Sequence, residues 1–212
     1  VSTTLRSSCA GRPLGPGLVT SISIAELPVK GAVLGSRGDR RPRVLVVITR
    51  GEPGGAQVHV RDLVCGLRDR VDFHVGVGDD DFLADELRKA DLPVHVVPDL
   101  QREVSPRADR RAVRSLRALV REVRPALVHT HSSKAGLLGR MAARLEGVPA
   151  LHTAHAWSFS DGLSWRRKAM AVPVEVLAGR FTSRFIVVSE ADREIAIRYG
   201  VGRDPQIRIV HN

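Results

Sequence analysis

The chain has 212 residues, with 33 Lys and Arg against 23 Asp and Glu, and a formal net charge of +10. An apolar share of 43% and a charged share of 26% are typical of globular proteins, and they exclude a collagen, a coiled coil or a fully disordered chain. Two cysteines are too few for a disulfide framework or a structural zinc site, so free thiols in a reducing compartment are expected.

The first 40 residues are rich in Gly, Pro and Ser and show neither a helical nor a strand period, which predicts a flexible leader before a domain at 41–212. The most apolar stretch of this segment, Leu18–Leu27, is interrupted by Ser and Thr and contains Glu26, which does not fit a signal peptide. No apolar run in the sequence approaches the roughly 20 residues of a membrane-spanning helix. A cytoplasmic location is therefore expected.

From residue 43 onward, short apolar runs alternate with amphipathic segments. The apolar runs predict seven strands, at 44–48, 73–77, 94–97, 126–130, 150–154, 185–188 and 207–210. The amphipathic segments predict helices near 58–67 and at 82–90, 107–123, 135–145, 163–179 and 190–199, with a break near Pro173. Each crossover is long enough for a helix, so the strands should be parallel. The expected fold class is α/β, a Rossmann-like doubly wound sheet with helices on both faces.

In such a sheet, ligands bind beyond the carboxyl ends of the strands. A glycine-rich turn, Gly51–Ala56, follows the first strand and opens the next helix, an arrangement that suits a phosphate. Its spacing matches neither the dinucleotide fingerprint G-x-G-x-x-G nor the P-loop, and a tight turn without a ligand is the alternative.

Histidines gather at two further strand ends. His129 and His131 end the fourth strand and should point the same way, while His152 and His155 belong to the end of the fifth. Two polar clusters at equivalent edges favour a binding site. The H-x-H spacing also fits zinc, but no acidic or thiol ligand follows closely until Asp161. After His131, the run Ser132–Lys134 is expected to cap the next helix and to offer an anion site.

In order and spacing, these motifs resemble the N-terminal, acceptor-side domain of the GT-B fold retaining glycosyltransferases of family 4. The matching segments are Gly54–Gln57, Val128–Gly136, Gly147–Pro149, His152–Trp157, Ile186–Glu190 and Ile209–Asn212. The resemblance implies a two-domain enzyme, and it implies that this chain stops before the C-terminal donor domain. The fragment alone is then expected to be inactive.

The resemblance also implies roles for individual residues. Gly54 and Gly55 match the loop that faces the donor diphosphate, and His155 matches the histidine that reaches the transferred sugar at the reaction centre. His131 and Lys134 match the border of the acceptor cleft. A nucleoside-diphosphate-sugar is the expected donor, with retention, and no metal or other cofactor is expected. Ala156 stands where the family often has Gly.

The basic segment 107–124 carries seven arginines and is either a solvated surface helix or a contact for anionic membranes. Residues 165–168, with the sequence Trp-Arg-Arg-Lys, add a second possible contact. A glycan or lipid-linked acceptor and a peripheral position at the inner membrane face are therefore expected. Aromatic residues make up only 4% of the chain, so nucleic acid is not an expected partner.

Two other functions remain open at this point. Asp79, at the end of the second strand, lies where an NAD-dependent oxidoreductase would bind a ribose, although the glycine spacing and the histidines disfavour this alternative. A basic, non-enzymatic nucleic-acid binder is suggested by charge alone. The D-x-D pattern within Asp79–Asp81 is interpreted as a solvated acidic turn.

Overall fold

The computed structural model describes residues 41–159 and 164–211. Seven parallel strands form one sheet in the order β3-β2-β1-β4-β5-β6-β7. Their bounds are β1 Arg43–Ile48, β2 Asp72–Val77, β3 Val94–Val96, β4 Leu127–His131, β5 Ala150–Ala154, β6 Arg184–Val187 and β7 Ile207–Ile209. The α/β, Rossmann-like fold class predicted from the sequence is confirmed. The predicted leader lies outside the described residues.

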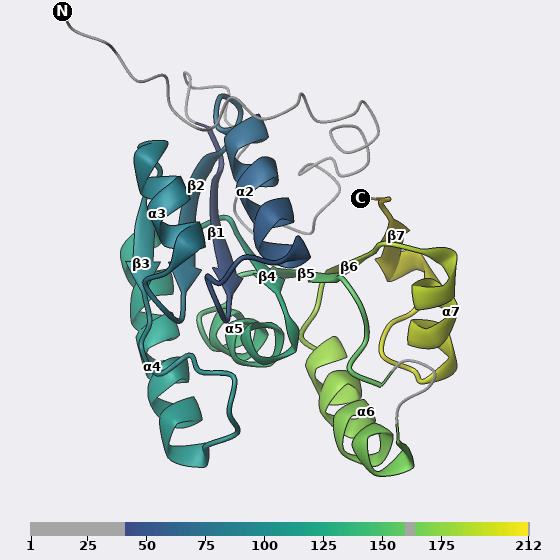
Figure 1. Cartoon of the computed structure of the whole chain (residues 1–212). Helices are drawn as coiled ribbons and strands as arrows, with labels where there is room; N and C mark the ends of the chain where they lie inside the picture. The colour runs from purple at the N-terminus through teal and green to yellow at the C-terminus, as the bar shows by residue number, and fades with distance from the viewer. Residues whose placement is uncertain (1–40, 160–163, 212) are drawn as a thin grey trace, which may run out of the picture.

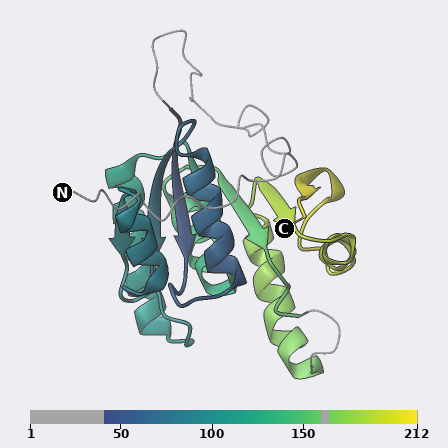
Figure 2. The ribbon, with the colours of Figure 1, turned by 45° about the horizontal axis from the view of Figure 1, so that its top comes forward.

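Helices cover the sheet from both sides. They are α2 Gly55–Leu67, α3 Phe82–Lys89, α4 Pro106–Val123, α5 Ser133–Leu145, α6 Trp165–Gly179 and α7 Glu190–Arg198, with a short 3-10 turn at Asp204–Gln206. The pair α2 and α3 packs on one face, and α4 and α5 pack on the other (Figure 1). The turned view shows α6 and α7 beside the β5–β7 half of the sheet (Figure 2).

The central strand β1 is buried on both faces, as its continuous β-branched run predicted. Val46 and Ile48 belong to the core under α2 and α3, and Leu45 and Val47 to the core under α4 and α5. The amphipathic pattern of the segment 58–67 favours Val58, Leu63, Val64 and Leu67 as its apolar stripe, and this is wrong for Val58, which is 37% exposed. The buried residues of α2 are Val60 and Val64.

Two further expectations fail. The helix α6 continues through Pro173 instead of breaking there. Glu175, two residues after this proline, forms a buried ion pair with Arg140 of α5. Cys65, on α2, is not a free thiol. Among residues 41–159 and 164–211, no helix combines the length and apolarity needed to cross a membrane.

Candidate functional site at the carboxyl edge of the sheet

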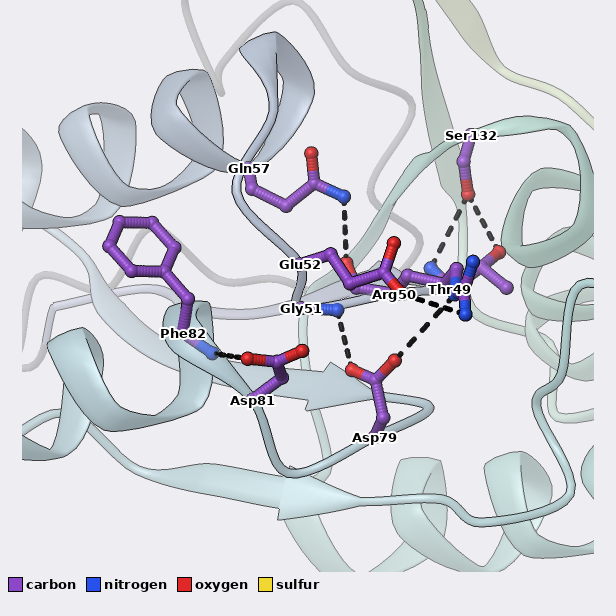
Figure 3. Close-up of polar contacts among 9 residues, drawn as sticks. All are labelled: Thr49, Arg50, Gly51, Glu52, Gln57, Asp79, Asp81, Phe82 and Ser132. Atoms are coloured by element: carbon purple, nitrogen blue, oxygen red, sulfur yellow. Dashed lines mark hydrogen bonds and ion pairs between the residues drawn. The ribbon is translucent and has the colours of Figure 1, made fainter.

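The loop after β1 is fixed by the loop after β2. The backbone N–H of Gly51 donates to Asp79 Oδ1 at 2.5 Å (Figure 3). The Gly51 carbonyl accepts from the N–H of Leu83 at 2.9 Å. Gln57 Nε2 donates to the carbonyl of Arg50 at 2.9 Å, and Arg50 itself lies within ion-pair distance of Asp79. Asp79 therefore holds the loop in place. Its carboxylate has partners in the β1 loop, and this arrangement gives no support to a role in binding a ribose.

The other carboxylates of the acidic turn also have protein partners. Asp80 pairs with Arg88, and Asp81 Oδ1 accepts from the N–H of Phe82 at 2.6 Å as the cap of α3. Asp80 and Asp81 are exposed, which agrees with the interpretation of this segment as a solvated acidic turn. Its side chains shape the edge from which the β1 loop emerges.

The diglycine turn leaves the first turn of α2 without a side-chain cap. Gly54 is the N-cap residue in an extended conformation with φ −173°, and its helix has no capping side chain, whereas Ser189 Oγ caps α7 by accepting from the N–H of Asp192. A Cβ atom added at Gly55 would meet nothing within 4 Å. The fold itself thus gives no steric reason for glycine at this position. The first N–H groups of α2 can donate to an anion that approaches closely.

A pair of hydroxyl groups joins the ends of β1 and β4. Thr49 Oγ1 lies 2.7 Å from Ser132 Oγ (Figure 3). Thr49 Oγ1 also accepts from the N–H of Ala135 at 3.0 Å. Ser132 has φ 64° and ψ 154°, a region that side-chain-bearing residues rarely occupy. The prediction that Ser132 caps α5 is wrong, because its hydroxyl is turned toward β1 and Thr49 supplies the cap instead.

The histidines of β4 and β5 point to different faces of the sheet, because successive residues of a strand point to opposite faces. His131, the last residue of β4, and His155, just after β5, point to the α2 side, where His131 Nδ1 lies 3.1 Å from His155 Nε2. His59, one helical turn into α2, joins them, with its ring centroid 5.0 Å from that of His155 and 5.8 Å from that of His131. Sequence reasoning missed His59, although its position four residues after Gly55 places it next to the same edge.

The other two histidines are held by strand hydroxyls. His129 Nε2 lies 2.8 Å from Thr153 Oγ1 on the α2 side of the sheet. His152 points to the opposite side, where its Nδ1 lies 2.9 Å from Thr130 Oγ1 and its ring packs against α5 at Gly136. The sequence grouped His152 with His155, but the structure does not bring them to one face.

Burial keeps these imidazoles neutral. Desolvation lowers the pKa of His155 to about 4, with a smaller contribution from His59, and lowers the pKa of His129 to about 3. The pKa of His131 lies well below its ordinary value for the same main reason. His131 is fully buried, whereas its neighbour His155 is half-buried. Among the described residues, His131 Nε2 has no hydrogen-bond partner.

Lys134 lies on the other side of the sheet from His131. Its Nζ is 2.6 Å from Asp109 Oδ1 of α4 and donates to the carbonyl of Glu103 at 2.5 Å. The structure therefore does not bring together the two residues that the sequence assigned to the acceptor border.

A hollow of about 410 Å³ begins beside this lysine contact and runs between α4 and α5. It is lined by Asp109, Arg110, Val113, Arg114, Arg117, Leu138 and Met141. The surface of this hollow is predominantly apolar, although three arginines and one aspartate belong to its lining. Arg117 is paired with Glu146, so Arg110 and Arg114 are the arginines of the lining that could meet an anionic group attached to an apolar part.

Comparison with known proteins identifies the family. Residues 54–212 match the sequence model of the glycosyl transferase 4-like domain. The chain belongs to this family. The diglycine turn, both histidine-bearing strand ends and the terminal strand of this glycosyl transferase 4-like domain all lie inside the matched range.

Individual relatives agree with this assignment. The domain is 38% identical over 122 residues to the Escherichia coli UDP-Gal:alpha-D-GlcNAc-diphosphoundecaprenol alpha-1,3-galactosyltransferase, a match that covers 56% of this chain and 30% of the relative. It superposes on Anabaena Alr3699/HepE, solved with UDP-glucose, with a TM-score of 0.64 and 25% identity over 80% of this chain and 43% of the other.

The fold is shared more widely. Neisseria meningitidis UDP-GlcNAc 2-epimerase, 12% identical, superposes with a TM-score of 0.58 over 79% of this chain and 45% of that protein. The chain thus spans less than half the length of the relatives it matches. The resemblance to family 4 glycosyltransferases and to the GT-B fold is confirmed.

Proposed function

We propose that this domain forms the acceptor-side half of a glycosyltransferase that moves a sugar from a nucleoside diphosphate to a lipid-linked or glycan acceptor, with retention. One observation carries the proposal. His59 lies one helical turn from the diglycine turn and contacts His155, so a diphosphate-binding turn and a sugar-contacting histidine lie on the same rim. The names of the relatives, which include a galactosyltransferase and a complex with UDP-glucose, support it.

The chemistry requires stabilisation of a leaving diphosphate. As the bond between the sugar C1 and the phosphate oxygen breaks, negative charge grows on the diphosphate and positive charge on the sugar. The uncapped N–H groups after Gly54 and Gly55 face the first of these charges. His155, a neutral imidazole, hydrogen-bonds a hydroxyl of the sugar, and His131 positions it through the contact at 3.1 Å. No metal ion is needed for these steps.

Retention follows from attack on the face that the diphosphate leaves. The acceptor oxygen forms its bond to C1 on that face while its proton passes to the departing phosphate oxygen. No nucleophile from this domain takes part. The anomeric configuration of the product, read by NMR, tests this part directly, since an inverted product would exclude it.

The acceptor side suits a molecule with an anionic headgroup and an apolar chain. The hollow between α4 and α5 offers Arg110 and Arg114 above Leu138 and Met141, and Lys134 lies next to it through Asp109. We assign a lipid-linked diphosphate acceptor to this side, consistent with the diphosphoundecaprenol substrate in the name of the E. coli relative. The exposed arginines of α4 and Trp165, 73% exposed at the start of α6, then contact an anionic membrane.

The decisive experiment changes His155 in the complete two-domain enzyme. In that protein His155→Ala should lower turnover about a hundredfold, with little change in the unfolding midpoint. The matched control, His95→Ala, alters a histidine on β3 far from this rim and should keep turnover. The 212-residue chain alone should show no transfer. Unchanged turnover in His155→Ala would remove this residue from the mechanism.

A second substitution tests the donor turn. A methyl group at Gly55 meets no protein atom, so Gly55→Ala should leave the stability of the domain nearly unchanged. In the complete enzyme it should raise the KM for the donor, because the methyl group occupies the space that the diphosphate needs. An unchanged KM would show that the diphosphate binds elsewhere.

A further inference from the structure

We propose that His59, His131 and His155 form a binding site for a divalent transition-metal ion of the Zn²⁺ class, with a fourth position open to water. One ring nitrogen from each of the three imidazoles lies within 4.8 Å of the other two. Imidazole nitrogens are ordinary ligands of Zn²⁺, Ni²⁺ and Cu²⁺, and three of them with one open position make a common zinc arrangement.

The spacing of two of the ligands already fits an ion. His131 Nδ1 and His155 Nε2 are 3.1 Å apart. With metal–nitrogen bonds of about 2.0–2.1 Å, this separation corresponds to an N–metal–N angle of about 98°. That angle lies between the octahedral and tetrahedral values, so an ion can replace the contact between the rings without moving either strand.

The third ligand needs only a side-chain adjustment. A tetrahedral ion requires its nitrogen ligands to lie about 3.3 Å apart, compared with the present upper limit of 4.8 Å. His59 is half-buried on the first turns of α2, and its ring already packs edge-on against His155. A rotation of this side chain is therefore enough to complete the set.

The hydrogen bonding of the cluster singles out these three residues. His129 and His152 have strand hydroxyls as partners. His131, by contrast, is fully buried, its Nδ1 meets another imidazole, and its Nε2 has no partner among the described residues. A buried polar atom left without a partner costs about 1–3 kcal/mol. Within this cluster His131 is therefore the histidine whose hydrogen bonding the described residues leave incomplete.

The ligand set selects the type of ion. It contains nitrogen and no carboxylate oxygen, so it disfavours Mg²⁺ and Ca²⁺, which require oxygen ligands. His131 and His155 are neutral near pH 7, the form in which imidazole binds metals, because burial lowers the pKa of each. Zn²⁺, Co²⁺ and Ni²⁺ are the appropriate probes.

Occupation of this site has a consequence that rests on the proposed function. The ion occupies His155 Nε2 and so replaces the contact with His131 Nδ1 that positions His155 toward the sugar. Zn²⁺ should therefore inhibit transfer by the complete enzyme, and a chelator should restore it. Such an ion is an inhibitor and not a cofactor, in agreement with a transfer step that needs no metal.

The test measures binding without any substrate. The 212-residue chain, freed of any histidine tag, is titrated with Zn²⁺ by calorimetry and with Co²⁺ by visible absorption. We expect one ion per chain and the intense absorption of a four-coordinate Co²⁺ site, with no heat from Mg²⁺. His59→Gln and His155→Asn should each lower the affinity at least tenfold. His95→Asn, which disrupts the His74–His95 pair at the opposite edge, should leave it unchanged.

Two results would overturn the site. One is the absence of Zn²⁺ binding at micromolar concentrations, and the other is an affinity that survives in His59→Gln and His155→Asn but falls in His95→Asn. Far-UV circular dichroism verifies that each variant is folded. Because His59 is only half-buried, His59→Gln changes the site without disturbing the core. Because no donor or acceptor is present, an enzyme that fails to transfer sugar leaves this outcome unaffected.

Discussion

Removing one partner of the buried ion pair between α5 and α6 should cost much of the stability of the domain. Arg140 is 0% exposed, and Glu175 is 5% exposed. The guanidinium donates to Glu175 Oε2 at 2.7 Å, to the carbonyl of Gly136 at 2.6 Å and to Thr182 Oγ1 at 3.2 Å. Arg140→Met leaves a carboxylate buried without its partner, which costs about 3–5 kcal/mol.

Removing both charges should cost far less than the sum of the single changes. In Arg140→Met/Glu175→Leu no charge remains buried, and Thr182 keeps its hydrogen bond to the carbonyl of Ala178. Replacement of a buried pair by apolar groups is often nearly neutral. We therefore expect a coupling energy above about 3 kcal/mol in the double-mutant cycle.

Urea unfolding of the 212-residue chain, followed by circular dichroism, measures these energies. With a slope of about 2 kcal/mol per molar, each single change should lower the midpoint by about 2 M. Arg193→Met, which breaks exposed pairs to Glu190 and Asp204, should shift stability by less than about 1 kcal/mol. Single changes that are mild, or that add in the double variant, would refute the argument that desolvation dominates this pair.

Three further predictions follow from other contacts. Thr49→Val should lower the unfolding free energy by about 2 kcal/mol, and Thr49→Ser should retain most of it, because the hydroxyl bonds Ser132 and the N–H of Ala135; equal stability of both variants would contradict this. Burial lowers the pKa of His74 and His95, beside Asp72, Arg43 and Glu122, so the unfolded chain takes up protons first and stability falls as the pH drops below about 6.5. Burial also lowers the pKa of His129, His131, His152 and His155, which contribute to the same fall. A pH series of thermal unfolding should therefore show a somewhat shallower fall in His95→Asn, and an unchanged slope would exclude a contribution from the pair. Arg110→Gln/Arg114→Gln should weaken low-salt binding to anionic vesicles by up to about 2 kcal/mol, while Arg198→Gln/Arg203→Gln should not; equal retention on neutral vesicles would count against membrane contact.

The strand positions were predictable because their signal is local. The run Val44–Ile48 has no polar residue and can only be a strand buried on both faces, and Ala150–Ala154 was predicted with its observed bounds. The shared direction of His129 and His131 followed from the period of a strand, and both residues face α2. Most predicted boundaries differ from the observed ones by a residue or two. A helix or strand ends where its backbone hydrogen bonds end, and this point need not coincide with the last apolar residue.

The missed features depend on contacts between distant segments. Nothing near His59 in the sequence indicates that it meets His155, because this contact requires α2 to lie over β4 and β5. The Thr49–Ser132 bond likewise joins residues 83 positions apart. The separation of His152 from His155 could have been foreseen, since residues three apart around a strand end fall on opposite faces.

The strand order explains why the rim of β1, β4 and β5 is the place where a ligand can enter. From β1 the chain leaves into α2 on one face, whereas from β4 it leaves into α5 on the other, although the two strands are neighbours. In open α/β sheets such a switch point is the usual place for a ligand. Ser132 turns the chain toward α5 while its hydroxyl lies 2.7 Å from Thr49 Oγ1, and this conformation has a positive φ. The diglycine turn and the cluster of His59, His131 and His155 lie on the α2 side of the sheet, and the hollow between α4 and α5 lies on the other side. A donor and an acceptor that approach from opposite faces would therefore meet above the Thr49–Ser132 bond.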